Sequence, residues 1–364
     1  MNFETFMESI KKHIKEYLPE SYQDAQVTIR EQQKLNNRYM GLTVIRPEDD
    51  RIPTINLTDL YRQSYENPRF RITDVLEQIS QIIQREPERF DVSRLTQYEE
   101  AKKHLFMRVS NADKNVQVLE GVPFVEREDL AITFHIAVEE TEAGRASAIV
   151  TNRMMETYGV TRNQLYEDAL ANSPVIAPVK INNLGELLGR MTVDGMKEMG
   201  ASEEEIREAK ERMDEANQDN PLIVVTNETG IDGAAAVFYP GVMDQLGEEI
   251  KGDFFILPSS VHEIIVAPDD GRLSHSEPLV VPDNGRISCH ELKAMVMAIN
   301  EKEVAPEDRL TDEVYHYDTR DHVFEKAEAF TERKRAKEQD IGKQEPVKET
   351  AAEKAVFYIS RLQF

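Results

Sequence analysis

Apolar residues recur at spacings of three and four in two stretches near the start of the chain. The first stretch comprises Phe3, Phe6, Ile10, Ile14 and Leu18. The second comprises Leu76, Ile79, Ile82 and Ile83. This spacing places the apolar side chains on one face of a helix, so the sequence predicts two amphipathic helices. Asn2 and Thr73 are the expected N-caps, and Pro19 and Pro87 follow the expected ends.

Alternation of apolar and polar residues replaces the helical spacing between these two helices. One alternating run ends at an Asn36-Asn37 turn and another follows over 39–45, which predicts a β-hairpin. A third short strand is expected over 52–57. Pro53 places this strand at the edge of the sheet, because proline has no backbone N–H to donate. The expected N-terminal order is therefore α-β-β-β-α.

The middle of the chain carries a second pair of alternating runs, over 130–138 and 146–150. A polar stretch containing Gly144 joins them, so they predict a second hairpin. Two helices are expected to follow, each opened by a capping box. The boxes are Thr161 with Gln164 and Ser202 with Glu205.

From residue 222 to residue 303 the pattern predicts the order β-β-α-β-β-α. The expected strands cover 222–226, 234–239, 254–257 and 261–266. One expected helix follows Tyr239 and ends with Gly252 as its C-cap. The other starts at Ser288 and buries one face, made of Leu292, Met295, Val296 and Ile299. This order favours an α+β layer over a doubly wound parallel sheet.

Two segments depart from these patterns. Residues 268–274 are repeated by 282–288, and each copy contains an Asp-Gly or Asn-Gly pair, so we interpret 268–288 as a duplicated turn-forming loop. The last forty residues mix nine basic and eight acidic residues with few large apolar groups. Such a sequence buries too little surface to offset the entropy of ordering, which predicts a flexible or partly helical tail.

Together these elements predict an α+β fold of small antiparallel sheets packed with helices. A chain of 364 residues exceeds the usual size of a single core, so we expect at least two domains. Residues 1–110 form the expected N-terminal α+β unit and 111–324 the second α+β region. Residues 325–364 form the expected charged, disordered tail.

The balance of charge narrows the expected partners. The chain has 44 basic and 68 acidic residues, a formal net charge of -24, which disfavours binding to nucleic acid or to an anionic membrane surface. A basic or neutral protein partner fits better. A single cysteine, Cys289, excludes an intrachain disulfide. No secretory signal and no stretch of about 20 apolar residues is present, so we expect a cytoplasmic protein of undetermined oligomeric state.

Residues 259–263 carry the hydroxyl, imidazole and carboxylate groups that a hydrolytic site requires. Neighbours on an extended strand point to opposite faces, so these groups cannot form a triad by themselves. A composite site remains open, in which neighbouring strands bring His262 and Glu263 together with Asn227. The alternative interpretation is that these side chains form hydrogen bonds within or beside the sheet.

Metal and cofactor sites find less support in the sequence. The zinc-protease spacing His-Glu-x-x-His is absent. His316 and His322 lie near Asp318 and Asp321, where either a weak metal site or solvated side chains would fit. The glycines of 230–233 follow a strand and precede no helix start of the phosphate-binding type, which favours a turn. The sequence therefore predicts no metal and no cofactor.

Several segments together resemble a known family. They are Asn220-Pro221-Leu222, Val225-Thr226-Asn227, Gly233-Ala234-Ala235, Tyr239-Pro240-Gly241-Val242, Gly252-Asp253-Phe254, 256–263 and 268–271. The chain resembles a bacterial family of unknown function found in gut anaerobes, often near mobile elements. The resemblance runs from the N-terminus to about His322. It transfers no catalytic residue, because the family has no assigned activity.

Two hypotheses about function follow. The first is a noncatalytic cytoplasmic binding or regulatory protein with a basic protein partner, favoured because no reactive groups converge and the chain is acidic. The second is an enzyme, such as a hydrolase, with a composite site around Asn227, His262 and Glu263.

Overall fold

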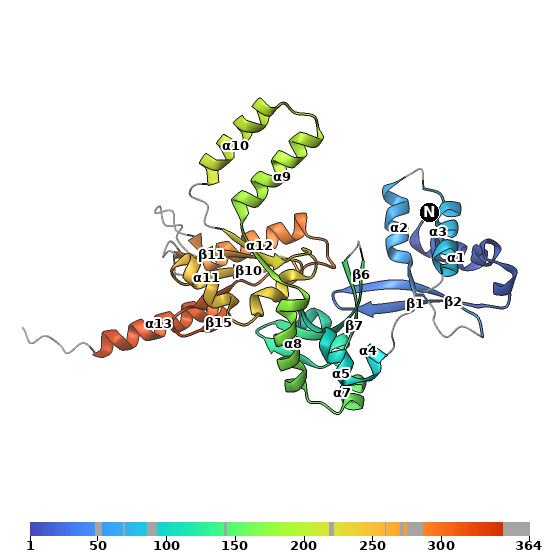
Figure 1. Ribbon diagram of the computed structural model, residues 1–364, viewed down its shortest axis with the longest axis horizontal. Helices are drawn as coiled ribbons and strands as arrows, with labels where there is room; N and C mark the ends of the chain where they lie inside the picture. The colour runs from blue at the N-terminus through green and yellow to red at the C-terminus, as the bar shows by residue number, and fades with distance from the viewer. Residues whose placement is uncertain are drawn as a thin grey trace, which may run out of the picture.

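A computed structural model describes residues 1–47, 53–67, 70–85, 93–141, 144–217, 222–258, 260–269, 273–274 and 287–344. Three small antiparallel sheets packed with helices make up the fold, which confirms the expected α+β class. Figure 1 shows the N-terminal unit at one end of the molecule and α13 (Ala327–Gln344) at the other. None of the helices in these ranges is long and apolar enough to cross a membrane.

The N-terminal unit folds around the first sheet, in the strand order β1-β2-β3. Its elements are α1 (Phe3–His13), η1 (Ile14–Tyr17), η2 (Glu20–Tyr22), β1 (Gln26–Lys34), β2 (Asn37–Ile45), β3 (Ile55–Asn56), α2 (Leu57–Glu66) and α3 (Ile72–Gln84). The first expected helix and the hairpin are confirmed. Asn2 caps α1, because its side-chain oxygen accepts a hydrogen bond from Thr5 N at 2.9 Å. Phe6, Ile10 and Ile79 are fully buried in the core of this unit.

The third strand is shorter than the prediction of 52–57, of which residue 52 lies outside the described residues. The strand covers only Ile55–Asn56. Asn56 ends it, because its side-chain oxygen accepts hydrogen bonds from Thr58 N at 3.0 Å and Asp59 N at 3.2 Å. These bonds cap α2, a helix that the sequence patterns did not predict.

The second sheet has the order β4-β6-β5, and β7 also pairs with β6. Its strands are β4 (Leu105–Asn111), β5 (Phe124–Arg127), β6 (Leu130–Thr141) and β7 (Gly144–Ile149). The surrounding helices are α4 (Ser93–Thr96), α5 (Tyr98–Ala101), η3 (Lys102–His104), η4 (Asp113–Asn115), α6 (Val116–Leu119), α7 (Asn152–Tyr158) and α8 (Arg162–Ile176). The pairing of β6 with β7 confirms the second hairpin. Strand β4 was missed because it is buried on both faces, so its apolar residues do not alternate.

The third sheet has the order β15-β14-β10-β11-β9-β8. Its strands are β8 (Val179–Asn183), β9 (Ile223–Asn227), β10 (Phe254–Leu257), β11 (Ile264–Pro268), β14 (Tyr315–Asp318) and β15 (Val323–Lys326). Its helices are α9 (Leu184–Glu198), α10 (Glu203–Asn217), η5 (Gly233–Phe238), α11 (Val242–Ile250), α12 (Cys289–Glu303) and α13. Two short strands, β12 (Leu273–Ser274) and β13 (Ile287–Ser288), join the two copies of the repeat in parallel. The remainder of the loop, 270–272 and 275–286, lies outside the described residues.

The strand expected over 234–239 is wrong, because these residues form the 3₁₀ helix η5. Gly233, at its start, lies so close to Asn227 N and the His262 carbonyl oxygen that a Cβ would come within 2.6 Å of both atoms. The small side chains of 234–236 are buried and let η5 pack closely on the sheet. The order of the described elements over 222–303 is therefore β-η-α-β-β-β-β-α, where the last two strands are the short β12 and β13.

Helix ends and faces differ from the prediction in detail. Helix α3 has Arg71 as its N-cap, so Thr73 lies inside it, and α11 ends at Lys251, which adopts a left-handed φ of 64° in place of Gly252. Three apolar residues expected to be buried are exposed. They are Ile82, Met295 and Ile299, at 39, 52 and 46%.

The buried side chains form two large clusters. One holds residues from Phe6 to Ile83, and the other spans the second and third sheets from Ala101 to Tyr317. Strand β4 belongs to the second cluster, so the N-terminal core ends before the predicted boundary at residue 110. The tip of the first hairpin contacts the second unit, where Asn36 N donates to Asn115 Oδ1 at 2.6 Å.

The beginning of the predicted tail is part of the folded structure. Residues 325–344 complete β15 and form α13, and Ala327 and Phe330 are buried. The prediction of disorder from residue 325 is therefore wrong for these residues. Residues 345–364 lie outside the described residues.

The Asp129 carboxylate connects the second sheet to the third. It follows β5 and accepts hydrogen bonds from Thr311 Oγ1 at 2.7 Å and Tyr315 Oη at 2.8 Å, and Lys326 Nζ lies 3.2 Å away. Burial opposes ionisation, but these three contacts outweigh it and hold the pKa of Asp129 below its ordinary value.

Candidate functional site

Asn227, one of the three predicted site residues, is buried at the end of β9. Its side-chain oxygen accepts hydrogen bonds from Thr229 N at 3.0 Å and Thr229 Oγ1 at 2.8 Å. Its side-chain nitrogen donates to the Ile231 carbonyl oxygen at 2.7 Å. The amide is thus engaged with the loop 228–232, and Asn227 holds that loop in shape.

His262 binds the same loop from the segment before β11. Its Nδ1 accepts a hydrogen bond from Asp232 N at 3.0 Å, which leaves the ring proton on Nε2, 3.3 Å from Asp308 Oδ1. The His262 carbonyl oxygen accepts a further bond from Thr226 Oγ1 at 2.7 Å. Both ring nitrogens therefore have a polar partner, and the imidazole holds the loop in place.

Glu263 does not join this arrangement. Its side chain makes no hydrogen bond or ion pair with any residue that the structure describes. The cavity beside Asn227 measures about 10 Å³, room for one water at most, and neither His262 nor Glu263 lines it. The structure thus brings Asn227 and His262 to one loop, and the small cavity beside Asn227 has no room for a substrate.

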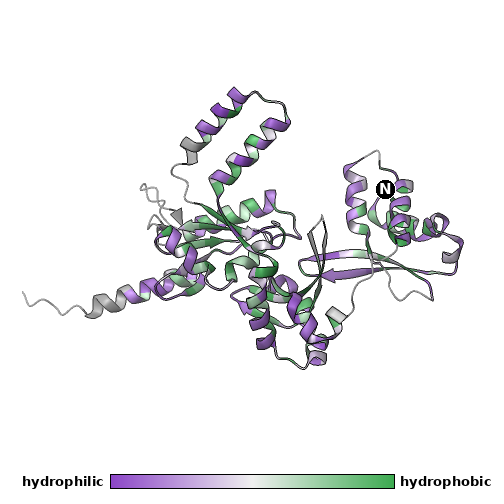
Figure 2. Cartoon of the chain, in the orientation of Figure 1, coloured by the Kyte–Doolittle hydropathy of each residue, from purple (hydrophilic) through white to green (hydrophobic). Residues whose placement is uncertain are grey.

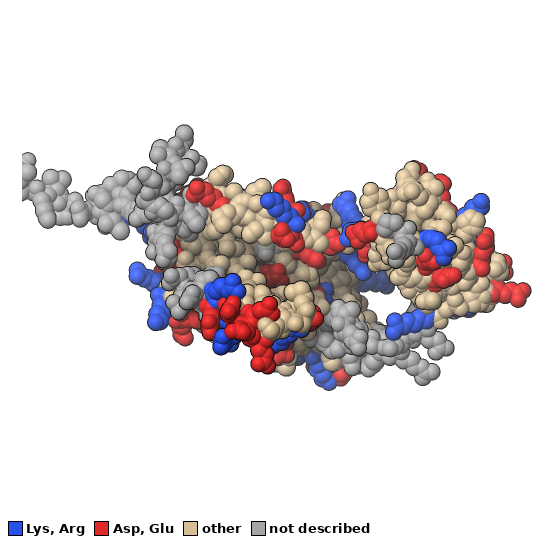
Figure 3. Space-filling model, turned by 90° about the horizontal axis from the view of Figure 1, so that it is seen from above, with Lys and Arg blue, Asp and Glu red and all other residues tan. Residues whose placement is uncertain are grey.

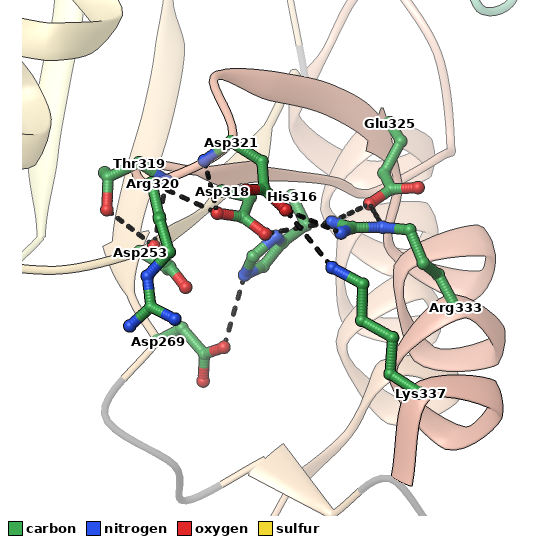
Figure 4. Close-up of polar contacts among 10 residues, drawn as sticks. All are labelled: Asp253, Asp269, His316, Asp318, Thr319, Arg320, Asp321, Glu325, Arg333 and Lys337. Carbon is green, nitrogen blue, oxygen red and sulfur yellow. Dashed lines mark hydrogen bonds and ion pairs between the residues drawn. The ribbon is translucent and has the colours of Figure 1, made fainter. Parts of the chain in front are cut away.

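His316 and His322, considered above as metal ligands, contact different carboxylates. His316 is fully buried on β14, and its Nε2 lies 3.2 Å from Asp269 Oδ2 (Figure 4). His322 Nδ1 lies 2.8 Å from Asp244 Oδ1. Within the described ranges, no group of three histidine, cysteine, aspartate or glutamate residues has the arrangement of a metal site.

A polar cluster fixes α13 to the third sheet (Figure 4). Arg333 Nε donates to Glu325 Oε1 at 2.8 Å and its Nη2 to Asp318 Oδ2 at 3.1 Å, while Lys337 Nζ lies 3.2 Å from Asp321 Oδ2. Burial opposes ionisation of Asp318, but hydrogen bonds from Asp321 N and Arg333 hold its pKa below the ordinary value. These ion pairs join α13 to β14, to β15 and to the turn between them, so the cluster serves to attach the helix.

The pair α9–α10, residues 184–217, is inserted between the adjacent strands β8 and β9 and is called the arm below. Strand β8 leads directly into α9, because Asn183 caps the helix by accepting from Glu186 N at 3.1 Å. Ser202 and Glu205 form the predicted capping box at the start of α10. The two helices contact mainly each other, and the arm projects from the body of the protein (Figure 1).

Apolar side chains on the arm remain exposed beside acidic ones. Leu188, Met191 and Met199 are 52, 63 and 82% exposed. Helix α10 has seven acidic and three basic residues, and Arg207 is paired with acidic residues of its own helix. Figure 2 shows hydrophobic residues on α9 beside a mostly hydrophilic α10. Figure 3, a view from above, shows acidic and basic side chains mixed among uncharged ones. The arm thus presents an exposed apolar strip, made of Leu188, Met191 and Met199, on a helix pair whose second member has a net negative charge.

The comparisons with known proteins place the chain in one family. A family of unknown function (DUF5688) matches residues 3–319. The chain belongs to the DUF5688 family. No curated protein and no solved structure matches it.

The DUF5688 match covers the first two sheets, the whole arm and the third sheet except β15, and it ends in the turn after β14. The sequence patterns predicted α10 from its capping box and did not predict α9. A signal was present, because Leu184, Leu187, Leu188 and Met191 recur at the spacing of an amphipathic helix. In this DUF5688 protein, two of these residues, Leu188 and Met191, belong to the exposed strip.

Proposed function

We propose that the protein is a noncatalytic binding protein whose arm engages a basic, amphipathic segment of a partner protein. The observation that carries the proposal is the exposure of Leu188, Met191 and Met199 on an element that projects from the body. Exposed apolar strips with a polar rim are typical of protein interaction sites.

The chemistry of the arm specifies the partner. Methionine side chains are flexible and polarisable, so they adapt to different apolar surfaces. The acidic residues of α10 favour cations beside the apolar strip and disfavour acidic partners. An amphipathic helix with lysine or arginine along one face and leucine along the other satisfies both requirements.

Changing the strip should abolish tight binding of such a helix. We expect Leu188→Gln, Met191→Gln and Met199→Gln combined to weaken binding of a synthetic leucine–lysine helical peptide roughly 100-fold, from about 1 kcal/mol of lost apolar burial per side chain. Glutamine preserves side-chain length and helix propensity, so the arm should stay folded. Titration calorimetry measures the affinity, and circular dichroism checks the helix content.

Tyr65→Gln is the matched control, because Tyr65 is 79% exposed on α2 and lies outside the arm. This variant should bind the peptide like the wild type. Binding should also weaken as salt rises from 50 to about 500 mM, because salt screens exposed charges. If the triple variant and the wild type bind the peptide equally, the arm is not the binding site.

The alternative of an enzyme at Asn227, His262 and Glu263 gains no support from the geometry, since the first two side chains hold a loop and the third stands apart. We further propose a bacterial, cytoplasmic setting. The proposed setting rests on the resemblance of the sequence to a bacterial family and on its amino-acid composition.

A further inference from the structure

A cavity of about 230 Å³ lies where the second and third sheets meet. Aromatic side chains form much of its lining. They are Tyr166 from α8, Phe238 and Tyr239 at the end of η5, Tyr317 from β14 and Phe324 from β15. Arg127, Asp244 and His322 also line it, together with Val237, Gly241 and Met243. Pockets for drug-sized ligands measure roughly 300–1,000 Å³, so this cavity suits a smaller molecule with one ring.

Arg127, at the end of β5, supplies the positive charge. Its guanidinium lies over the Tyr166 ring, 5.9 Å from the centroid, and its Nη2 donates to Tyr166 Oη at 3.3 Å. Arg127 forms no ion pair with a carboxylate of the described part of the chain. Its Nη1 also donates to the Glu126 carbonyl oxygen, at a long 3.5 Å. The planar fork is therefore oriented by an aromatic ring, and its charge remains available to an anion.

His322 is fixed in orientation by two neighbours. Asp244 Oδ1 accepts hydrogen bonds from Tyr317 Oη and His322 Nδ1, both at 2.8 Å. In the neutral ring, a proton on Nδ1 leaves a lone pair on Nε2, for which the described residues offer no partner. His322 also adopts a left-handed φ of 52°, which is uncommon outside glycine. The ring is thus positioned to accept a hydrogen bond at the cavity.

We propose that this cavity binds a small aromatic carboxylate, with the ring on the aromatic lining, the carboxylate on Arg127 and a hydroxyl substituent donating to His322 Nε2. Arg127 offers a single positive charge, and the Asp244 carboxylate lies in the same lining. This balance favours a monoanion over a doubly charged phosphate. A guanidinium matches the two oxygens of a carboxylate with two parallel hydrogen bonds.

The test is titration of the full-length protein with four probes, followed by NMR shifts or calorimetry. The probes are 4-hydroxybenzoate, benzoate, 4-hydroxybenzamide and inorganic phosphate. We expect 4-hydroxybenzoate to bind most tightly and benzoate about threefold more weakly, since it lacks one neutral hydrogen bond. The neutral 4-hydroxybenzamide should bind at least about tenfold more weakly than 4-hydroxybenzoate, because it lacks the charged contact with Arg127.

Two variants separate the contacts. Arg127→Gln should weaken the binding of 4-hydroxybenzoate at least about tenfold. Because Arg127 is exposed, this variant should keep its fold. His322→Asn should lower the affinity for 4-hydroxybenzoate about threefold and leave the affinity for benzoate unchanged. Arg153→Gln on α7, outside the cavity, is the matched control and should bind like the wild type.

Equal affinity of the wild type and Arg127→Gln for 4-hydroxybenzoate would overturn the proposal. So would an affinity for inorganic phosphate equal to that for 4-hydroxybenzoate, or no binding of any aromatic probe up to about 10 mM, which corresponds to less than about 3 kcal/mol.

Discussion

Replacing Gly233 with alanine is expected to destabilise the protein by about 3 kcal/mol. The added Cβ would lie 2.6 Å from Asn227 N and from the His262 carbonyl oxygen, and closer still to Thr226 Oγ1. Two of these atoms belong to the backbone, which cannot move aside without disturbing β9 and the loop that follows it. Equilibrium denaturation, followed by circular dichroism, measures this loss of stability.

Gly195→Ala is the control for this substitution. A Cβ at Gly195, within α9, meets no atom within 4 Å, and alanine favours helix, so stability should be unchanged or rise by up to about 1 kcal/mol. If Gly233→Ala were as stable as the wild type, the loop held by Asn227 and His262 would not be rigid. That result would restore it as a candidate binding site.

Removing the Asp129 side chain is expected to lower the free energy of unfolding by about 3 kcal/mol. In Asp129→Ala, Tyr315 Oη loses its acceptor and Lys326 loses a buried counter-ion, because both contact this carboxylate. The same change loosens the attachment of the second sheet to the third. Asp24→Ala, at an exposed position, is the matched control. Its free energy of unfolding should differ from that of the wild type by less than about 0.5 kcal/mol.

The contribution of Asp129 should depend on pH. Its folded pKa lies below its ordinary value of about 4, so the folded state binds this proton less readily than the unfolded state. The stabilisation is fully present above about pH 4 and is lost as the pH falls through the folded pKa. The stability difference between the wild type and Asp129→Ala should therefore shrink in acid. A difference that stays constant down to about pH 2 would contradict this role.

The sequence was most informative where burial is one-sided. Hairpin β1–β2 and the faces of α1 and α3 bury one side each, so their periodicity was visible. Strand β6 is buried on both faces over 130–136, but its buried polar residues Thr133 and His135 preserve an alternating pattern. Strand β4 is buried on both faces and has no alternation to detect. The six residues of η5 resembled a strand because small apolar residues fit either structure. Only the contact of Gly233 with the His262 backbone, distant in sequence, decides between them.

The candidate sites were less accessible to sequence reasoning. Asn227 and His262 hold the same loop, but several of their hydrogen-bond partners are backbone groups that no residue pattern identifies. The aromatic cavity gathers residues from Arg127 to Phe324 across nearly 200 positions of the chain. Such convergence depends on how the two sheets pack and leaves no local motif.

Deletion of the arm tests the central claim most directly. Asn183 of β8 pairs with Ile223 of β9, so residues 184–222 can be replaced by an Asn-Gly turn that keeps the hairpin register. We expect the shortened protein to retain its cooperative unfolding and its affinity for 4-hydroxybenzoate, and to lose all binding of the leucine–lysine peptide. A folded, shortened protein that binds the peptide as tightly as the full chain would contradict the account.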